Sequence, residues 1–206
     1  MTRSTLLRTL LVLPLVLLFG VMSASAGFKV GDKASDFSLK NVNGKEVSLA
    51  KYKEAKGFIV VFTCNHCPFA KLYEDRIIAL DKQFASKGYP VIAINSNDPS
   101  QAPDDSFDNM VKRARTHEYT FPYLFDEAQT VVAAYGATNT PHVFILQKEN
   151  TDLLVRYIGS IDDNAQNPME APKHYVENAV NALLTGKAVA VTQTKAIGCG
   201  ILLKKK

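Results

Sequence analysis

Short apolar runs alternate along this chain with segments whose apolar residues recur at helical spacing. The run from Phe58 to Thr63 is continuous and rich in β-branched side chains, which is typical of a strand covered on both faces of a sheet. Apolar residues from Phe69 to Phe84 then recur at helical spacing, and Tyr89 to Ile94 forms a second buried run. Strand, helix and strand in this order leave room for a right-handed parallel crossover. The alternation therefore predicts an α/β fold.

The same alternation continues through the second half of the chain. A helix is predicted over 107–114, with Asp104 and Asp105 at its start. The pattern then predicts strands over 121–125, 142–146 and 153–158 and helices over 128–135 and 175–183. A polar turn over 147–152 joins two of the strands, and the irregular, proline-containing stretch 161–173 is interpreted as a surface loop. The segments form one domain, since neither a repeat nor a linker interrupts them.

A β-hairpin is predicted ahead of the first buried strand. Phe37 and Leu39 alternate with polar residues, Val47 and Leu49 do so again, and Asn43-Gly44 lies between the two pairs. Asn-Gly suits the two positive φ values of a type I′ turn. The fold expected is a central sheet flanked by helices, with this hairpin at its N-terminal side.

The first 26 residues have the features of a signal peptide. Arg3 and Arg8 precede an uncharged run from Leu10 to Met22, and Ala24-Ser25-Ala26 follows as a cleavage site. The run is shorter than the ~20 residues of a membrane-spanning helix, although a retained anchor is the alternative. We expect cleavage to leave one domain over 27–206, secreted or periplasmic, with no stable membrane anchor.

Charge and cysteine content exclude several classes of protein. Lys and Arg total 24 against 20 Asp and Glu, and the basic residues are scattered apart from Lys204, Lys205 and Lys206, so we expect no nucleic-acid partner. The cysteines number 3, too few for a disulfide scaffold, and a domain of this size can bury a core without one. The cysteines are therefore expected to carry chemistry.

Cys64-Asn65-His66-Cys67 lies where the first buried strand ends and the long helix begins. Unpaired amides and the positive end of the helix dipole stabilise a thiolate there, and pKa values of roughly 3.5 to 7.5 are known for such cysteines. We expect Cys64, at the exposed end of the strand, to be the nucleophile and Cys67 to lie one turn inside. A protonated His66 would add positive charge beside the sulfurs, and Pro68 suits the first helical turn.

Strand, C-x-x-C and helix, followed much later by Thr140-Pro141 before a strand, resemble the thioredoxin fold. The resemblance implies a redox-active Cys64–Cys67 disulfide and a cis Thr140-Pro141 peptide bond that packs against it. It also implies that the backbone of Thr140 is offered to an extended substrate. The N-terminal segment 33–39 with its hairpin is similar to the redoxin branch, which includes alkyl hydroperoxide reductase and thiol-specific antioxidant proteins. The motifs 63–68, 95–98, 135–141 and 198–201 resemble a peroxiredoxin-like, C-x-x-C-bearing family within it.

Each of these residues also has a plainer interpretation. A C-x-x-C can hold structural zinc, but the four histidines show no ligand spacing, so no metal is expected. For His66 the alternative is a solvated turn residue, and His142 is interpreted as a strand-edge residue. Cys199 is either a third redox cysteine or, as we favour, a small residue packed in a C-terminal turn. Asp98, Asp104 and Asp105 are interpreted as helix caps, with a proton acceptor for the cysteines as the alternative.

A thiol peroxidase is the alternative activity. Typical peroxiredoxins carry P-x-x-x-T-x-x-C, and counting back from Cys64 places Val61 at the threonine and Gly57 at the proline. Counting from Cys67 places Cys64 and Val60 there, so neither register fits. We therefore predict an exported thiol-disulfide oxidoreductase that needs no cofactor and acts on protein thiols or disulfides with an unknown redox partner. A peroxidase and a non-catalytic or metal-binding module remain the alternatives.

Overall fold

The computed structural model describes residues 27–205. The signal peptide expected over 1–26 lies outside the described residues and stays a prediction. Among the helices of the described part, none combines the length and apolarity that crossing a membrane requires.

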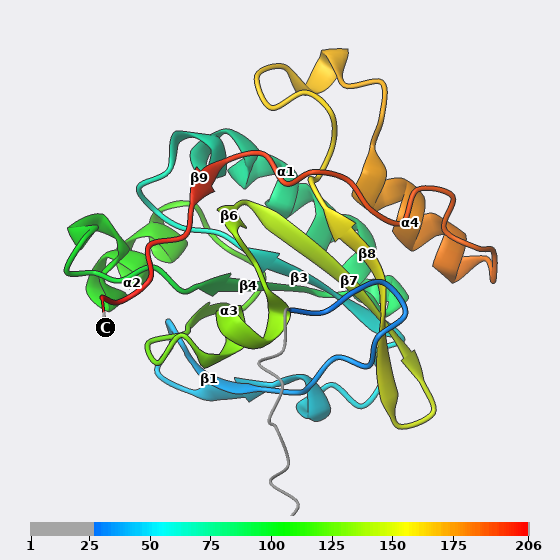
Figure 1. Cartoon of the computed structure of the whole chain (residues 1–206), viewed down its shortest axis with the longest axis horizontal. Helices are drawn as coiled ribbons and strands as arrows, with labels where there is room; N and C mark the ends of the chain where they lie inside the picture. Colours follow the sequence, from blue (N-terminus) through cyan, green and yellow to red (C-terminus); the bar gives the residue numbers. More distant parts are fainter. Residues whose placement is uncertain (1–26, 206) are drawn as a thin grey trace, which may run out of the picture.

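A seven-stranded mixed sheet forms the centre of the molecule (Figure 1). Its strands β3, β4 and β5 run parallel, as the strand-helix-strand pattern predicts, and the remaining neighbours pair antiparallel. From one edge to the other the order is β2 (Glu46–Ser48), β1 (Ser38–Asn41), β5 (Tyr123–Phe125), β4 (Val91–Asn95), β3 (Gly57–Phe62), β7 (His142–Glu149) and β8 (Asp152–Gly159).

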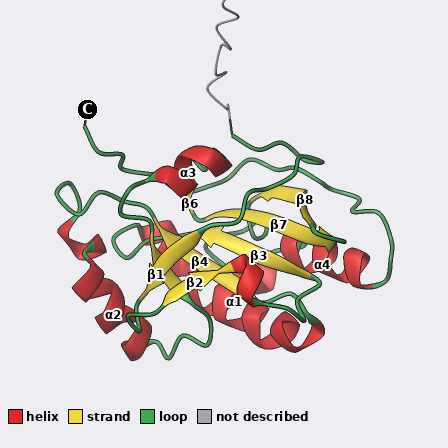
Figure 2. Ribbon diagram, turned by 90° about the horizontal axis from the view of Figure 1, so that it is seen from below, coloured by secondary structure: helices red, strands yellow, loops and turns green. Residues whose placement is uncertain are grey.

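Helices cover both faces of the sheet (Figure 2). One face packs against α1 (Pro68–Phe84), α2 (Phe107–Thr116) and α4 (Tyr175–Leu184), and the other against α3 (Thr130–Tyr135). Because β3 lies between the two layers, all of its residues are buried, as its continuous apolar run predicts. The α/β fold with a mixed sheet flanked by helices is confirmed. Short 3-10 turns complete the elements: η1 (Leu49–Lys51), η2 (Ala85–Lys87), η3 (Pro103–Asp105) and η4 (Pro168–Glu170).

The N-terminal hairpin is confirmed, but its turn differs from the one expected. Gly44 has φ +81°, whereas Asn43 is not among the residues with positive φ. The Gly44 N–H donates to the Asn41 carbonyl, and the Asn41 N–H donates to the Lys45 carbonyl. This is a three-residue loop that ends in a left-handed glycine. The type I′ prediction is wrong because the loop holds one more residue than such a turn allows.

Two further segments differ from the sequence-based expectations. The polar turn over 147–152 is shorter than expected, because β7 runs to Glu149 and β8 starts at Asp152. The surface loop over 161–173 is fixed at its base, where Asp162 is buried and accepts hydrogen bonds from Tyr73 and Arg76. These contacts tie the base of the loop to α1.

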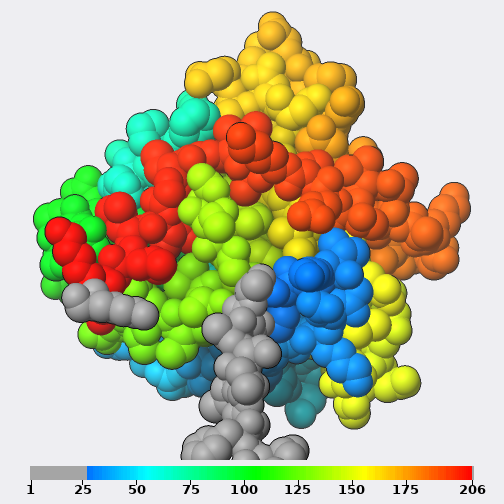
Figure 3. All heavy atoms as spheres, in the orientation of Figure 1, coloured from blue at the N-terminus to red at the C-terminus, as the bar shows by residue number. Residues whose placement is uncertain are grey.

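A second, two-stranded sheet was not expected from the sequence. It pairs β6 (Asn139–Thr140) with β9 (Cys199–Gly200) antiparallel. The C-terminal segment that contains β9 lies on the surface of the molecule, across the residues around β6 (Figure 3). The pairing brings the end of the chain to the loop before Pro141.

Candidate active site

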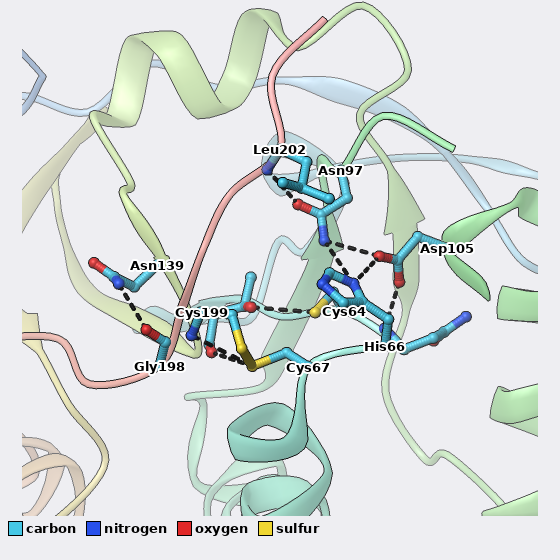
Figure 4. The surroundings of a disulfide bond; sticks show 11 residues. Cys64, His66, Cys67, Asn97, Asp105, Asn139, Gly198, Cys199 and Leu202 are labelled. Carbon is cyan, nitrogen blue, oxygen red and sulfur yellow. Dashed lines mark hydrogen bonds and ion pairs between the residues drawn. A yellow bond between two sulfur atoms is a disulfide. The ribbon is translucent and has the colours of Figure 1, made fainter. Parts of the chain in front are cut away.

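The C-x-x-C segment links the end of β3 to the start of α1 (Figure 4). Cys67 is the N-cap of α1, and Pro68 occupies its first turn, where a missing N–H costs little. The strand-to-helix placement is thus as predicted, but the expectation that Cys67 lies one turn inside the helix is wrong, because Pro68 is the first helical residue. The peptide bond between Thr140 and Pro141 is cis, and Thr140 lies against both cysteines. Its hydroxyl is 3.1 Å from the Cys64 sulfur, and its carbonyl oxygen is 3.3 Å from the Cys67 sulfur.

Cys64 differs from the expectation in exposure and in acidity. Its side chain is only 3% exposed, and this burial raises the pKa of the Cys64 thiol. The Asp105 carboxylate raises it further, while the Thr140 hydroxyl and the backbone of Cys67 and His66 lower it by hydrogen bonding. The pKa is raised overall because desolvation is the largest of these effects, since a thiolate loses its hydration when it is buried. The expectation of an exposed sulfur with a lowered pKa is therefore wrong for this form.

Cys67 is joined to Cys199 by a disulfide bond. Cys67 is fully buried and Cys199 is partly exposed, and the Cys199 N–H is 3.4 Å from the Cys67 sulfur. Cys64 is a free thiol in this arrangement. The interpretation of Cys199 as an isolated packed residue is therefore wrong. The pairing could not be predicted from cysteine spacing, because 132 residues separate the two cysteines. The Cys64–Cys67 disulfide stays a prediction for another redox state.

Asp105 lies beneath the C-x-x-C loop and not merely at a helix start. Its side chain is fully buried, and it accepts hydrogen bonds from the backbone N–H of Asn65 at 2.6 Å and from the side chain of Asn97 at 2.8 Å. The Asn95 side chain donates to the same carboxylate at 3.1 Å. A buried carboxylate needs such donors to remain ionised. The interpretation of Asp105 as a helix cap is wrong, whereas Asp98 does accept within its own turn, from Ser100.

His66 turns toward Asp105. Its Nδ1 lies 2.5 Å from the Asp105 carboxylate, and its side chain is 28% exposed. A protonated imidazole would therefore form its closest charge pair with the carboxylate and offset the negative charge that Asp105 places near the sulfur. The alternative of a merely solvated turn residue is wrong.

His142 has a structural role, as its position suggested. It begins β7 and is 7% exposed, and its Nδ1 accepts a hydrogen bond from the Thr138 N–H at 3.2 Å. Burial lowers the pKa of His142 to about 4, so the ring is neutral at physiological pH. It holds the loop before Pro141, and among the described residues no hydrogen bond joins it to either cysteine of the C-x-x-C.

Three side chains of the site have atoms that can ligate a metal. The Cys64 sulfur, a His66 ring nitrogen and an Asp105 oxygen lie within 4.8 Å of one another. Sequence spacing does not predict this set of ligands, because Asp105 follows the C-x-x-C by about 40 residues. Both Asp105 oxygens already accept hydrogen bonds from Asn65, Asn95 and Asn97. A metal ion would have to displace one of these donors and the His66 contact.

Comparison with known proteins decides the family. The AhpC/TSA family model matches residues 30–157. The chain belongs to the AhpC/TSA family. Two solved structures superpose on it with TM-scores of 0.80: an uncharacterized conserved protein from Geobacillus kaustophilus, 39% identical, covers 87% of this chain and 94% of its own. A hypothetical protein from Sinorhizobium meliloti, 33% identical, covers 87% of this chain and 97% of its own.

A third relative carries a functional name. The thiol-disulfide oxidoreductase ResA of Halalkalibacterium halodurans is 23% identical over 145 residues, which is 70% of this chain and 78% of that protein. The family match and this similarity identify the chain as an oxidoreductase with the thioredoxin-like fold. They confirm the resemblance to the redoxin branch that the motifs indicated.

Proposed function

We propose that this chain is an exported thiol-disulfide oxidoreductase that exchanges a Cys64–Cys67 disulfide with protein substrates. The observation that carries the proposal is the contact of Thr140, which precedes a cis proline, with both sulfurs of a C-x-x-C at the N-terminus of α1. The similarity to a protein named thiol-disulfide oxidoreductase supports it. The partners expected are protein thiols or disulfides and a redox partner that returns the chain to its starting state.

The chemistry in the reductive direction has two exchange steps. The Cys64 thiolate attacks one sulfur of a substrate disulfide, so that a mixed disulfide forms and the other substrate sulfur leaves as a thiolate. The Cys67 thiolate then attacks the Cys64 sulfur and releases the second substrate thiolate, and the Cys64–Cys67 bond takes the place of the substrate bond. Cys67 lies at the N-cap of α1, where the first amides of the helix have no partner within it.

Single-cysteine variants test this assignment. Both are made in a Cys199→Ser background, so that the third sulfur cannot resolve the intermediate. Cys64→Ser should abolish reduction of insulin by dithiothreitol, whereas Cys67→Ser should accumulate mixed disulfides because only the second step is lost. Trapping of equal amounts by the two variants would contradict the roles given to them. The reduction potential, measured against glutathione, gives the direction of exchange.

Two assays separate the alternatives. Consumption of hydrogen peroxide by the reduced protein, without insulin reduction, would favour a thiol peroxidase. Stoichiometric zinc in the purified protein, lost on Asp105→Asn, would favour a metal-binding module that uses Cys64, His66 and Asp105. The proposal expects insulin reduction that persists after treatment with a chelator.

Export is proposed from the leader sequence over residues 1–26. The test is expression of the full chain in a Gram-negative host, followed by fractionation and N-terminal sequencing. Recovery of a chain that starts at Gly27 in the periplasm is expected. An uncleaved chain in the membrane fraction would favour the retained anchor.

A further inference from the structure

The C-terminal strap, which we define as residues 198–204, crosses the candidate active site in an extended conformation (Figures 1 and 4). Its strand β9 pairs antiparallel with β6, with Cys199 opposite Thr140 and Gly200 opposite Asn139. Among the described residues β6 has no other strand partner. Without the strap, the backbone edge of β6 that β9 occupies would be unpaired, and such an edge accepts extended peptides by strand addition. The strap therefore occupies the backbone edge beside the two reactive cysteines.

Polar contacts from both sides hold the strap in place. The Ile201 N–H donates to the Thr138 carbonyl at 3.0 Å, and the Asn139 side chain donates to the Gly198 carbonyl at 2.9 Å. On the other side the Leu202 N–H donates to the Asn97 side chain at 2.8 Å. The residues of the strap are partly or fully exposed. Among the described residues of the strap, Cys199 and Ile201 pack against core clusters. A segment held mainly by hydrogen bonds, with so few apolar contacts, can detach without unfolding the domain once the disulfide is reduced.

The fit of the strap depends on a glycine. Gly198 has φ +154°, and a Cβ built on it would lie 2.0 Å from the Thr140 carbonyl oxygen. That oxygen belongs to the backbone, so it cannot move aside as a flexible side chain would. At Gly200, two residues further along the strap, a Cβ would meet no atom within 4 Å. Any side chain at position 198 should therefore lift the strap, whereas a methyl group at position 200 should not.

The strap also supplies the third sulfur of the site. We propose, as an extension of the proposed function, that the strap acts as a built-in substrate strand and that Cys199 is a third redox cysteine, which accepts the disulfide from the C-x-x-C. The Cys199 thiolate attacks the Cys67 sulfur of a Cys64–Cys67 disulfide. The Cys67–Cys199 bond forms, the Cys64–Cys67 bond breaks, and Cys64 leaves as a thiolate that takes the proton given up by Cys199. No electrons enter or leave the chain.

After the transfer, Cys64 and Cys199 have different roles, since one reacts with the substrate and the other with the reductant. Cys64 attacks the substrate disulfide, and after the transfer it is again a free thiol and is buried. Cys199 is the more exposed end of the new disulfide, since Cys67 is fully buried. A dithiol reductant attacks the Cys199 sulfur, forms a mixed disulfide there and releases the Cys67 thiolate. Its second thiol then frees Cys199, and the reductant leaves as a disulfide.

A single-turnover experiment tests the transfer. Fully reduced full-length protein is mixed with one equivalent of insulin, quenched with acid at successive times, alkylated and mapped by mass spectrometry. We expect the Cys64–Cys67 disulfide to appear first and to be replaced by Cys67–Cys199. Cys199→Ser should stop at the first disulfide while still reducing insulin. Gly198→Val should slow the replacement about tenfold or more, because docking sets the effective concentration of Cys199 at Cys67.

Gly200→Ala is the matched control, and it should transfer the disulfide at the wild-type rate. A Cys64–Cys67 disulfide that persists in the wild type would overturn the proposal, and so would wild-type transfer in Gly198→Val. Failure of the proposed function gives a different result. In that case neither the wild type nor Cys199→Ser reduces insulin, and stoichiometric oxidation by diamide still shows whether Cys67 pairs with Cys199 or with Cys64.

Discussion

Acid should destabilise this protein through one buried imidazole, that of His142. Burial lowers the pKa of His142 from 6.5 to about 4. Because the unfolded chain binds the proton more tightly, it gains protons over this range that the folded chain does not. The stabilising effect of the neutral ring is complete above pH 6.5 and is lost as the pH falls toward 4. Protonation would also remove the acceptor of the Thr138 N–H.

The size of the effect follows from the two pKa values. A shift from 6.5 to about 4 corresponds to about 3 kcal/mol of unfolding free energy when the loss is complete. About 2 kcal/mol of this should be lost between neutral pH and roughly pH 5, since the unfolded form is then largely protonated and the folded form is not. Other groups titrate in the same range, so the measurement has to be a difference between variants.

Urea unfolding of the wild type and His142→Asn across this pH range isolates the contribution. The asparagine oxygen can still accept from the Thr138 N–H, but it does not titrate. His174→Asn is the control, because His174 is an exposed histidine at the N-cap of α4. We expect His142→Asn to lose about 2 kcal/mol less than the wild type on acidification, and the control to follow the wild type. Parallel curves for all three proteins would refute the reasoning.

Two further predictions concern buried carboxylates. Asp105→Asn should lower the pKa of the Cys64 thiol, because the Asp105 charge opposes the thiolate. Titration of the thiolate absorbance measures this pKa in a variant that keeps Cys64 as its one cysteine. An unchanged or raised pKa would contradict the assigned cause. Asp162→Ala should cost about 3 kcal/mol in urea unfolding, since it leaves the Arg76 guanidinium with backbone carbonyl partners but without its carboxylate partner. It should also speed proteolysis within 161–173, and a loop as resistant as in the wild type would show that this ion pair does not anchor it.

The parts of the fold that the sequence predicted are those with local signals. The run before Cys64 and the helical spacing after it place β3 and α1 to within a residue or so, because a side-chain period is set by neighbours a few positions away. The cis bond before Pro141 came from a resemblance carried by a short motif. The strands β6 and β9 are too short to have a period at all.

The parts of the site that were missed depend on contacts between distant segments. Asp105 reaches the Asn65 backbone across 40 positions, and Cys199 reaches Cys67 across 132. The pKa of Cys64 was mispredicted for the same reason. Its place at a strand end and a helix start suggests exposure, and only the packed structure shows that the sulfur is covered. Burial depends on what the rest of the chain lays over a residue, which a local motif does not encode.

The Asn97 side chain links the His66 ring to the C-terminal segment. Its oxygen accepts from the Leu202 N–H, 105 positions away, which fixes its amide nitrogen toward the Asp105 carboxylate and the His66 ring. If the C-terminal segment leaves, the amide is free to rotate and the ring loses a fixed neighbour. The His66 resonances in a nuclear magnetic resonance spectrum should then shift. The relative intensities of the two sets of signals would give the fraction of molecules in which the C-terminal segment is bound to Asn97 and the fraction in which it is released.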